Sequence, residues 1–123
     1  MPRLVLASGS RWRRQLLDRL ELPYAWQSPD IDETPRPGES PSGLVHRLAL
    51  TKAQHLADEW PQHLIIGSDQ IALFAGEVLG KPANLAAARA QLARFSGNRV
   101  RFVTGLALVD TRHGRHRGCD ETY

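Results

Sequence analysis

Asp69 is the residue whose position most strongly suggests chemistry. It lies in the run from His63 to Phe74, which alternates with the period of a β-strand, and it shares one face with Ile65, Gly67 and Ile71. Burying a carboxylate without a partner costs several kcal/mol, so this face predicts a positive group close to Asp69. A salt bridge to a core-facing basic residue would meet that need, and so would a metal ion or a catalytic role.

Lys52 is the cation that a helix could bring to a buried face. The segment from Ser42 to Trp60 has helical periodicity and ends before Pro61. Lys52 lies inside its apolar arc, where a lysine either extends its stem toward solvent or points its ammonium into a polar pocket. Extension toward solvent is the more common outcome. The apolar arc consists of Leu44, Val45, Leu48, Ala49, Ala53 and Leu56.

The N-terminal segment has the pattern of a phosphate cradle. Leu4–Ala7 predicts a buried strand, the small residues Ser8–Ser10 predict a turn, and Ser10 is a candidate N-cap for a helix. Arg11, Arg13 and Arg14 then crowd the helix start, where each cation costs about 0.3–1 kcal/mol. A bound anion would explain that placement, and a solvated basic helix start is the alternative.

The rest of the chain predicts elements that alternate between strands and helices. Tyr24–Trp26 predicts a short strand, and the proline-rich stretch from Ser28 to Gly43 is a loop that carries Asp30, Asp32 and Glu33. These carboxylates are either solvated or functional. Asn84 is a candidate cap for a helix that closes at Gly97.

Near the C-terminus, Arg99–Asp110 predicts a further strand and Thr111–Gly118 predicts a hairpin tip with Gly114 at the turn. Strands alternating with helices predict an α/β fold, and 123 residues correspond to at most one domain.

Composition narrows the classes of function. The chain is 41% hydrophobic and 24% charged, as in ordinary globular proteins, with a net charge of +3 and a pI near 9.6. The positive charge suggests nucleic acid, but the arginines form only two short clusters without interleaved aromatic residues, and a small anionic ligand fits the charge equally well. The single cysteine, Cys119, excludes an internal disulfide and metal–thiolate sites. The sequence contains no signal-peptide core or membrane span, which predicts a cytoplasmic protein.

The unusual polar residues together suit a polyphosphate and a hard cation. Carboxylate oxygens are ligands for Mg²⁺ or Mn²⁺, while lysine and arginine would neutralise the remaining phosphate charge. Water could then attack phosphorus, with the basic groups stabilising the transition state. The set comprises Ser8, Ser10, Arg13, Glu33, Lys52, Asp69 and Lys81.

On these residues the chain resembles the Maf family of nucleoside triphosphate pyrophosphatases. The matching pieces occur in the family's order over nearly the whole chain, and they imply an α/β fold with a mixed sheet flanked by helices. They also imply hydrolysis between the α- and β-phosphates, giving a nucleoside monophosphate and pyrophosphate. The pieces are LVLASGSRWRR from Leu4, Asp32–Thr34, Lys52–Ala53, Ile66–Gln70, Gly80–Pro82 and Val103–Gly105.

The resemblance also implies a role for each site residue. Asp69 would accept the proton of the attacking water or hold the metal that activates it, with Glu33 as a second metal ligand. The phosphates would be contacted by Ser8, Arg13, Lys52 and Lys81. The expected cofactor is Mg²⁺ or Mn²⁺, the expected partner is a nucleotide rather than nucleic acid or a membrane, and a homodimer is one candidate assembly.

Trp12 and Gln70 correspond to positions that select the substrate in this family. Tryptophan followed by Arg13 and Arg14 is similar to the branch acting on 7-methyl-GTP, and an indole could stack on a methylated, positively charged purine. An ordinary amphipathic helix residue is the other interpretation of Trp12. Hydrolysis of dTTP or UTP, and nucleotide binding without turnover, remain the alternative functions.

Two departures from the family pattern stand out. Arg11 occupies the position after the second serine where the family usually has proline, a change that the first helical position tolerates. Family members also continue well past Tyr123, with further strands, a helix and another specificity glutamine. We therefore expect residues 1–123 to form a single, incomplete domain that stops where the next strand should begin and leaves an open sheet edge.

Overall fold

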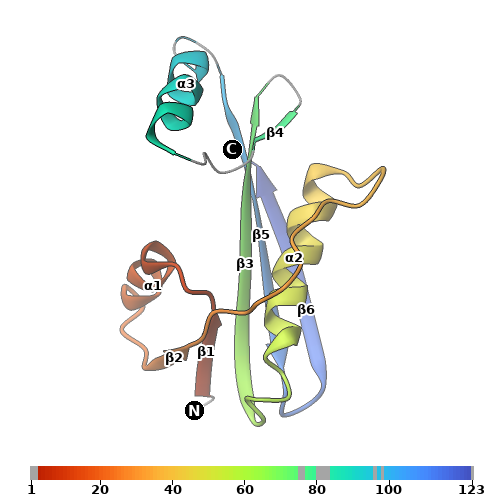
Figure 1. Cartoon of the computed structure of the whole chain (residues 1–123). Coiled ribbons are helices and arrows are strands. Elements are labelled where there is room, and N and C mark those ends of the chain that lie inside the picture. The colour runs from red at the N-terminus through yellow and green to blue at the C-terminus, as the bar shows by residue number, and fades with distance from the viewer. Residues whose placement is uncertain (1–2, 75–76, 80–83, 96, 98, 123) are drawn as a thin grey trace.

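The computed structural model describes residues 3–74, 77–79, 84–95, 97 and 99–122. Within these ranges, the chain forms a six-stranded mixed sheet and three helices (Figure 1). This confirms the predicted α/β class. The strands are β1 (Arg3–Ala7), β2 (Tyr24–Trp26), β3 (His63–Phe74), β4 (Glu77–Leu79), β5 (Arg101–Asp110) and β6 (Arg115–Thr122); the helices are α1 (Arg11–Asp18), α2 (Pro41–His55) and α3 (Leu85–Phe95).

Strand β3 organises the sheet. The strand order is β2-β1-β3-β5-β6, and β4 pairs separately with the end of β3. Strand β1 runs parallel to both β2 and β3, whereas β5 runs antiparallel to β3 along ten residue pairs. The long central strand predicted from the alternation of His63–Phe74 is therefore confirmed, with Ile65, Gly67 and Asp69 buried on one face.

Helix α2 covers that buried face. Its apolar arc is buried as predicted, and the core beneath it contains Val5, Ile65 and Val109. The helix ends at His55, earlier than the predicted Trp60, because the chain turns at Leu56. There the N–H groups of Leu56 and Ala57 bond to carbonyls only three residues back.

Three glycines allow α2 to lie close to the sheet. A Cβ atom at Gly67 would overlap the carbonyl oxygen of Ala49, and one at Gly105 would overlap the carbonyl oxygen of Val45. On β6, a Cβ atom at Gly118 would meet the imidazole of His46. The backbone of α2 therefore rests directly on β3 and β5, at positions where only glycine fits.

The C-terminal prediction was wrong in one respect. The hairpin turn with Gly114 is present, with a φ of 65° at that glycine, but β6 begins at Arg115 and pairs with β5 as far as Thr122. The next strand is therefore part of this chain. The segment has almost no apolar residues, and its extended conformation depends on hydrogen bonds to β5 rather than on its own pattern.

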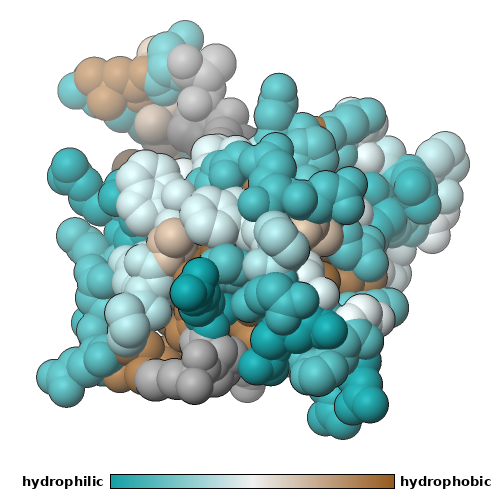
Figure 2. Space-filling model, turned by 90° about the horizontal axis from the view of Figure 1, so that it is seen from below, coloured by the Kyte–Doolittle hydropathy of each residue, from teal (hydrophilic) through white to brown (hydrophobic). Residues whose placement is uncertain are grey.

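Helix α3 stands away from the sheet (Figure 1), and Figure 2 shows its hydrophobic side chains at the upper left, apart from the mainly hydrophilic body. Asn84 caps it as predicted, accepting a hydrogen bond of 2.8 Å from the N–H of Ala87. Leu85 and Leu92 of its apolar stripe are both 68% exposed. None of the helices in the described residues is long and apolar enough to span a membrane.

The glycine contacts generate a stability prediction. Gly67→Ala should lower the free energy of unfolding by about 3 kcal/mol, at the upper end for overpacking, since the new methyl group meets a backbone carbonyl that cannot rotate away. Gly118→Ala is the matched control, because its methyl group meets a histidine side chain that can move. Urea denaturation measures both. Equal losses in the two variants would contradict the close approach of α2.

Candidate active site

The candidate site centres on the ammonium group of Lys52. Its Nζ atom lies 2.9 Å from Asp69 Oδ1 and 2.9 Å from Glu33 Oε1, and it donates a longer bond of 3.5 Å to the carbonyl of Ser68. Lys52 and Asp69 are buried, with 8% and 7% of their surface exposed. Lys52 therefore does not extend toward solvent. Lys52 is the positive partner that the sequence predicts for Asp69, and the two residues form a salt bridge.

Glu33 reaches Lys52 from a different part of the chain. It lies in the loop between β2 and α2, and its side chain remains 54% exposed. The other loop carboxylates do not meet the ammonium: Asp32 accepts a 2.9 Å hydrogen bond from the N–H of Thr34, and Asp30 lines the nearby pocket. Thus, of Asp30, Asp32 and Glu33, Glu33 alone joins the buried pair.

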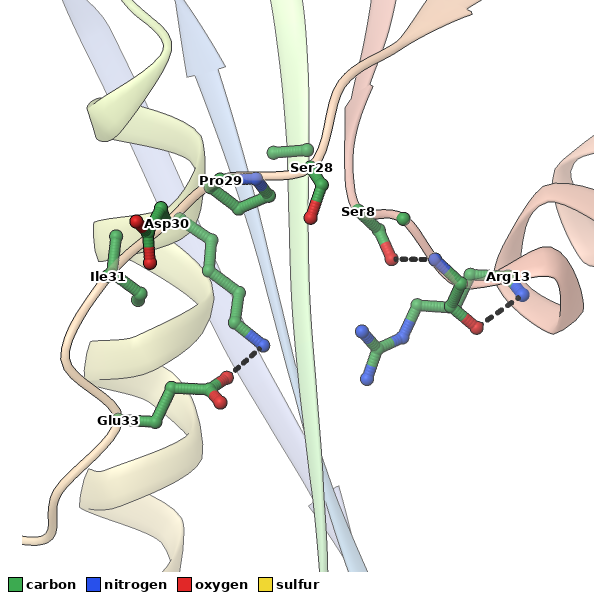
Figure 3. A pocket seen from close by; sticks show the side chains of 11 residues that line it. Ser8, Arg13, Ser28, Pro29, Asp30, Ile31 and Glu33 are labelled. Atoms are coloured by element: carbon green, nitrogen blue, oxygen red, sulfur yellow. Dashed lines mark hydrogen bonds and ion pairs between the residues drawn. The ribbon is translucent and has the colours of Figure 1, made fainter.

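A pocket of about 490 Å³ opens beside these charges. It is lined by Ala7–Ser10 and Arg13 on one side, and by residues 28–31, Glu33 and Lys52 on the other (Figure 3). The end of β1 and the start of α1 therefore face the loop that follows β2 across a polar cavity. Its lining combines the cationic side chains of Arg13 and Lys52 with hydroxyl and carboxylate groups.

The turn before α1 has the geometry of an N-terminal cap. Ser10 Oγ accepts a hydrogen bond of 3.3 Å from the N–H of Arg13, and Ser8 Oγ accepts one of 3.0 Å from the N–H of Ser10 (Figure 3). The predicted N-cap is confirmed. The guanidinium of Arg14 stacks over Trp26 at 4.0 Å from the ring centre, so Arg14 is held at β2 while Arg13 lines the pocket.

The predicted specificity residues, Trp12 and Gln70, do not line the pocket. Trp12 on α1 is 63% exposed, and Gln70 donates a 3.1 Å hydrogen bond to Thr104 on the neighbouring strand. Lys81, expected to contact phosphate, lies outside the described residues. The structure thus brings together Ser8, Arg13, Glu33, Lys52 and Asp69 of the predicted set.

The residues present suit a divalent cation held jointly with a ligand. Within the described ranges no group of three or more His, Cys, Asp or Glu side chains gathers in one place. The carboxylates of Glu33 and Asp69 lie close to each other, because both contact the ammonium group of Lys52. Mg²⁺ is commonly bound by one or two carboxylates together with substrate phosphates and water, so the pair fits that mode.

The chain also matches known proteins. It matches the family described as "Maf-like protein" over residues 3–123. The chain belongs to this family. It is 70% identical over 123 residues to a 7-methyl-GTP pyrophosphatase of Chromohalobacter salexigens and 58% identical over 114 residues to one of Pseudomonas syringae pv. tomato. These matches cover 100% and 93% of this chain, but only 64% and 59% of the relatives, so the chain spans about three fifths of their length.

Solved structures agree on the fold. A HAM1 protein from Coxiella burnetii has a TM-score of 0.59 at 24% identity, and the Staphylococcus aureus Ham1 protein has a TM-score of 0.61 at 16% identity. The matches cover 100% and 98% of this chain, and 71% and 69% of those chains. At this identity the likeness concerns the fold, and it supports the architecture expected of a Maf protein.

Sequence reasoning missed the contact that holds the loop of Glu33 in place. Arg47 on α2 donates hydrogen bonds of 2.6 Å and 2.9 Å to the two carboxylate oxygens of Glu39, and a third of 3.1 Å to the carbonyl of Thr34. Glu39 is only 12% exposed and also accepts from the N–H of Arg36. The available signal was an arginine on α2 eight residues after a loop glutamate, a spacing too common to single out.

This contact generates a pH prediction. Hydrogen bonds from Arg47 and then from the Arg36 N–H lower the pKa of Glu39 from 4.5 to about 2. Its stabilising contribution is therefore complete above pH 4.5 and is lost as the pH falls toward 2. We expect the melting temperature of the wild type to fall more steeply across this range than that of Glu39→Gln. The difference between the two curves isolates Glu39, because Asp32 and Asp110, whose pKa values are also lowered, titrate in both proteins. Parallel curves would exclude this role for Glu39.

Proposed function

We propose that this protein acts as a nucleoside triphosphate pyrophosphatase on 7-methyl-GTP, releasing 7-methyl-GMP and pyrophosphate. The observation that carries the proposal is Lys52, whose ammonium joins the carboxylates of Asp69 and Glu33 at the edge of a polar pocket. A triphosphate needs cations around its oxygens and a carboxylate near the attacked phosphorus. The names of the relatives, which are 7-methyl-GTP pyrophosphatases, support the same activity.

In the proposed reaction, Asp69 accepts the proton of a water molecule that attacks the α-phosphorus, and the bond to the bridging oxygen breaks so that pyrophosphate leaves. Lys52 holds Asp69 in place and lies within reach of the phosphates. Ser8 and Arg13 contact the phosphates from the α1 side, with Lys81 as a further phosphate ligand. A Mg²⁺ or Mn²⁺ ion held by Glu33 and Asp69 would supply charge neutralisation on the phosphate oxygens.

Location and assembly remain parts of the proposal. The substrate is a free nucleotide, so neither nucleic acid nor a membrane is required. We place the protein in the cytoplasm, where nucleotides are found, with a homodimer as one candidate assembly. A second candidate function is hydrolysis of dTTP or UTP, and a third is nucleotide binding without turnover.

The proposal is tested by pyrophosphate release from 7-methyl-GTP, GTP, dTTP and UTP with Mg²⁺ or Mn²⁺. We expect 7-methyl-GTP to be preferred, and Asp69→Asn to reduce its turnover about 10²- to 10⁴-fold, the range for loss of a general base. Asp110→Asn is the matched control, because this carboxylate pairs with Arg112 at the end of β5, whereas Asp69 lies opposite Gly105 in the middle of that strand. Full activity of Asp69→Asn would contradict its assignment. Nucleotide binding without release from any of the four would favour the third function.

A separate prediction concerns the choice of base. If Trp12 stacks on the methylated purine, Trp12→Ala should lower the preference for 7-methyl-GTP over GTP about tenfold, because cation–π contacts contribute about 0.5–2 kcal/mol. The ratio of the two kcat/KM values measures this preference. Gln15→Ala, an exposed residue on the same helix, is the control that should leave the ratio unchanged. An unchanged ratio in Trp12→Ala would contradict stacking on the base and would leave Trp12 as an ordinary surface residue of α1.

A further inference from the structure

The ammonium group of Lys52 occupies the space between two carboxylates. Its Nζ atom lies 2.9 Å from one oxygen of Asp69 and 2.9 Å from one oxygen of Glu33, so these two oxygens are at most twice that distance apart. Mg²⁺ in proteins binds carboxylate oxygens at about 2.0–2.1 Å. A divalent ion that took one oxygen from each carboxylate would therefore lie close to the present position of Nζ.

The charges do not favour both cations at once. Two carboxylates carry two negative charges, which one divalent ion neutralises, whereas the ion and the ammonium together leave one positive charge in excess. Lys52 and Asp69 are only 8% and 7% exposed, so water screens this excess poorly and the two cations repel each other strongly. The ammonium and the ion therefore compete for the same two carboxylates.

A phosphate group in the polar pocket changes the outcome of this competition. Released from its ion pairs, Lys52 would be a buried charge without compensation, which is costly. Lys52 lines the polar pocket of about 490 Å³, and Figure 3 shows Ser8 and Arg13 on the side of that pocket opposite Glu33. Phosphate oxygens bound there would give the released ammonium a new anionic partner and remove the cost.

We propose that Lys52 is an internal counter-ion, which lowers the affinity of the free protein for the divalent ion and leaves the carboxylates when a phosphate enters the pocket. This inference rests on the proposed function, from which it takes the metal ligands and the phosphate site. Holding Asp69 and reaching the phosphates then belong to two states of Lys52, without and with nucleotide. Ion and nucleotide must bind with positive coupling, each raising the affinity for the other by the same factor.

Binding of Mn²⁺ to the nucleotide-free protein tests the competition. Free Mn²⁺ is measured from its electron paramagnetic resonance signal with the wild type and with Lys52→Gln, whose uncharged amide can still donate a hydrogen bond to Asp69. We expect the variant to bind Mn²⁺ about tenfold more tightly or better, because in the wild type the apparent Kd is raised by the small fraction of molecules whose carboxylates are free. Equal or weaker binding by Lys52→Gln would overturn the proposal.

Arg13→Gln is the matched control for net charge. It removes one positive charge from the lining of the same pocket and leaves both ion pairs of Lys52 in place. Arg13 also lines a second, mainly apolar pocket of about 260 Å³ between α1 and the other face of the sheet. We expect its Mn²⁺ affinity to change by no more than about threefold, because solvent and salt screen this charge. A gain as large as that of Lys52→Gln would overturn the proposal in favour of a general effect of charge.

A second measurement follows Lys52 in a protein that keeps this residue, so it does not depend on the folding of Lys52→Gln. The chain has two lysines, Lys52 and Lys81, so selective ¹⁵N labelling gives two ammonium resonances, which Lys81→Arg assigns. We expect the Lys52 resonance to stay in place with Mg²⁺ alone and to shift with Mg²⁺ and 7-methyl-GMP together. A shift with Mg²⁺ alone, or no shift with both ligands bound, would overturn the proposal.

Failure of the proposed function gives a different result. It appears as absence of pyrophosphate release from the wild type and as absence of 7-methyl-GMP binding in equilibrium dialysis. The comparison of Mn²⁺ binding uses no nucleotide, so it still decides whether Lys52 and a divalent ion compete for Asp69 and Glu33.

Discussion

The buried pair of Asp69 and Lys52 is the constraint on which the site depends. A carboxylate on the covered face of β3 has to meet a positive group, or the fold loses several kcal/mol. Among the described residues, α2 is the helix that covers that face, and it lies close enough for Lys52 to reach the carboxylate. Gly67 and Gly105 allow this close approach of the helix to the sheet, because a Cβ atom at either position would overlap the backbone of α2. The glycines, the lysine and the aspartate therefore act as one arrangement.

Around this fixed pair, the other half of the site is held by a tethered loop. Glu33 is more than half exposed, and an ion pair at such a position contributes little to stability by itself. The loop is instead fastened further along, where both carboxylate oxygens of Glu39 bond to Arg47 on α2. The attachment of the loop to α2 through Glu39 is therefore separate from the Glu33–Lys52 ion pair.

Parts of this arrangement could be predicted from the sequence, and the reasons are local. Alternation in β3 identified the buried position of Asp69, and the serine before α1 identified the cap, because both signals lie within a few residues. The partner of Asp69 could not be decided, since a lysine on an apolar arc has two outcomes that depend on what lies above it. Strand β6 was missed because pairing with β5, and not its own composition, makes it extended.

The alternation of side chains along β3 places the residue proposed for phosphate chemistry and the residue proposed for base recognition on opposite faces of the sheet. Asp69 and Gln70 are neighbours in sequence, so their side chains point to opposite faces of the sheet. Asp69 meets Lys52 beneath α2, whereas Gln70 bonds to Thr104 on the other face, the side on which α1 lies. Under the proposed function, the reacting phosphate and the base are therefore read on different sides of one strand. A nucleotide would have to cross the sheet edge near Arg13, the residue that lines the pockets on both sides.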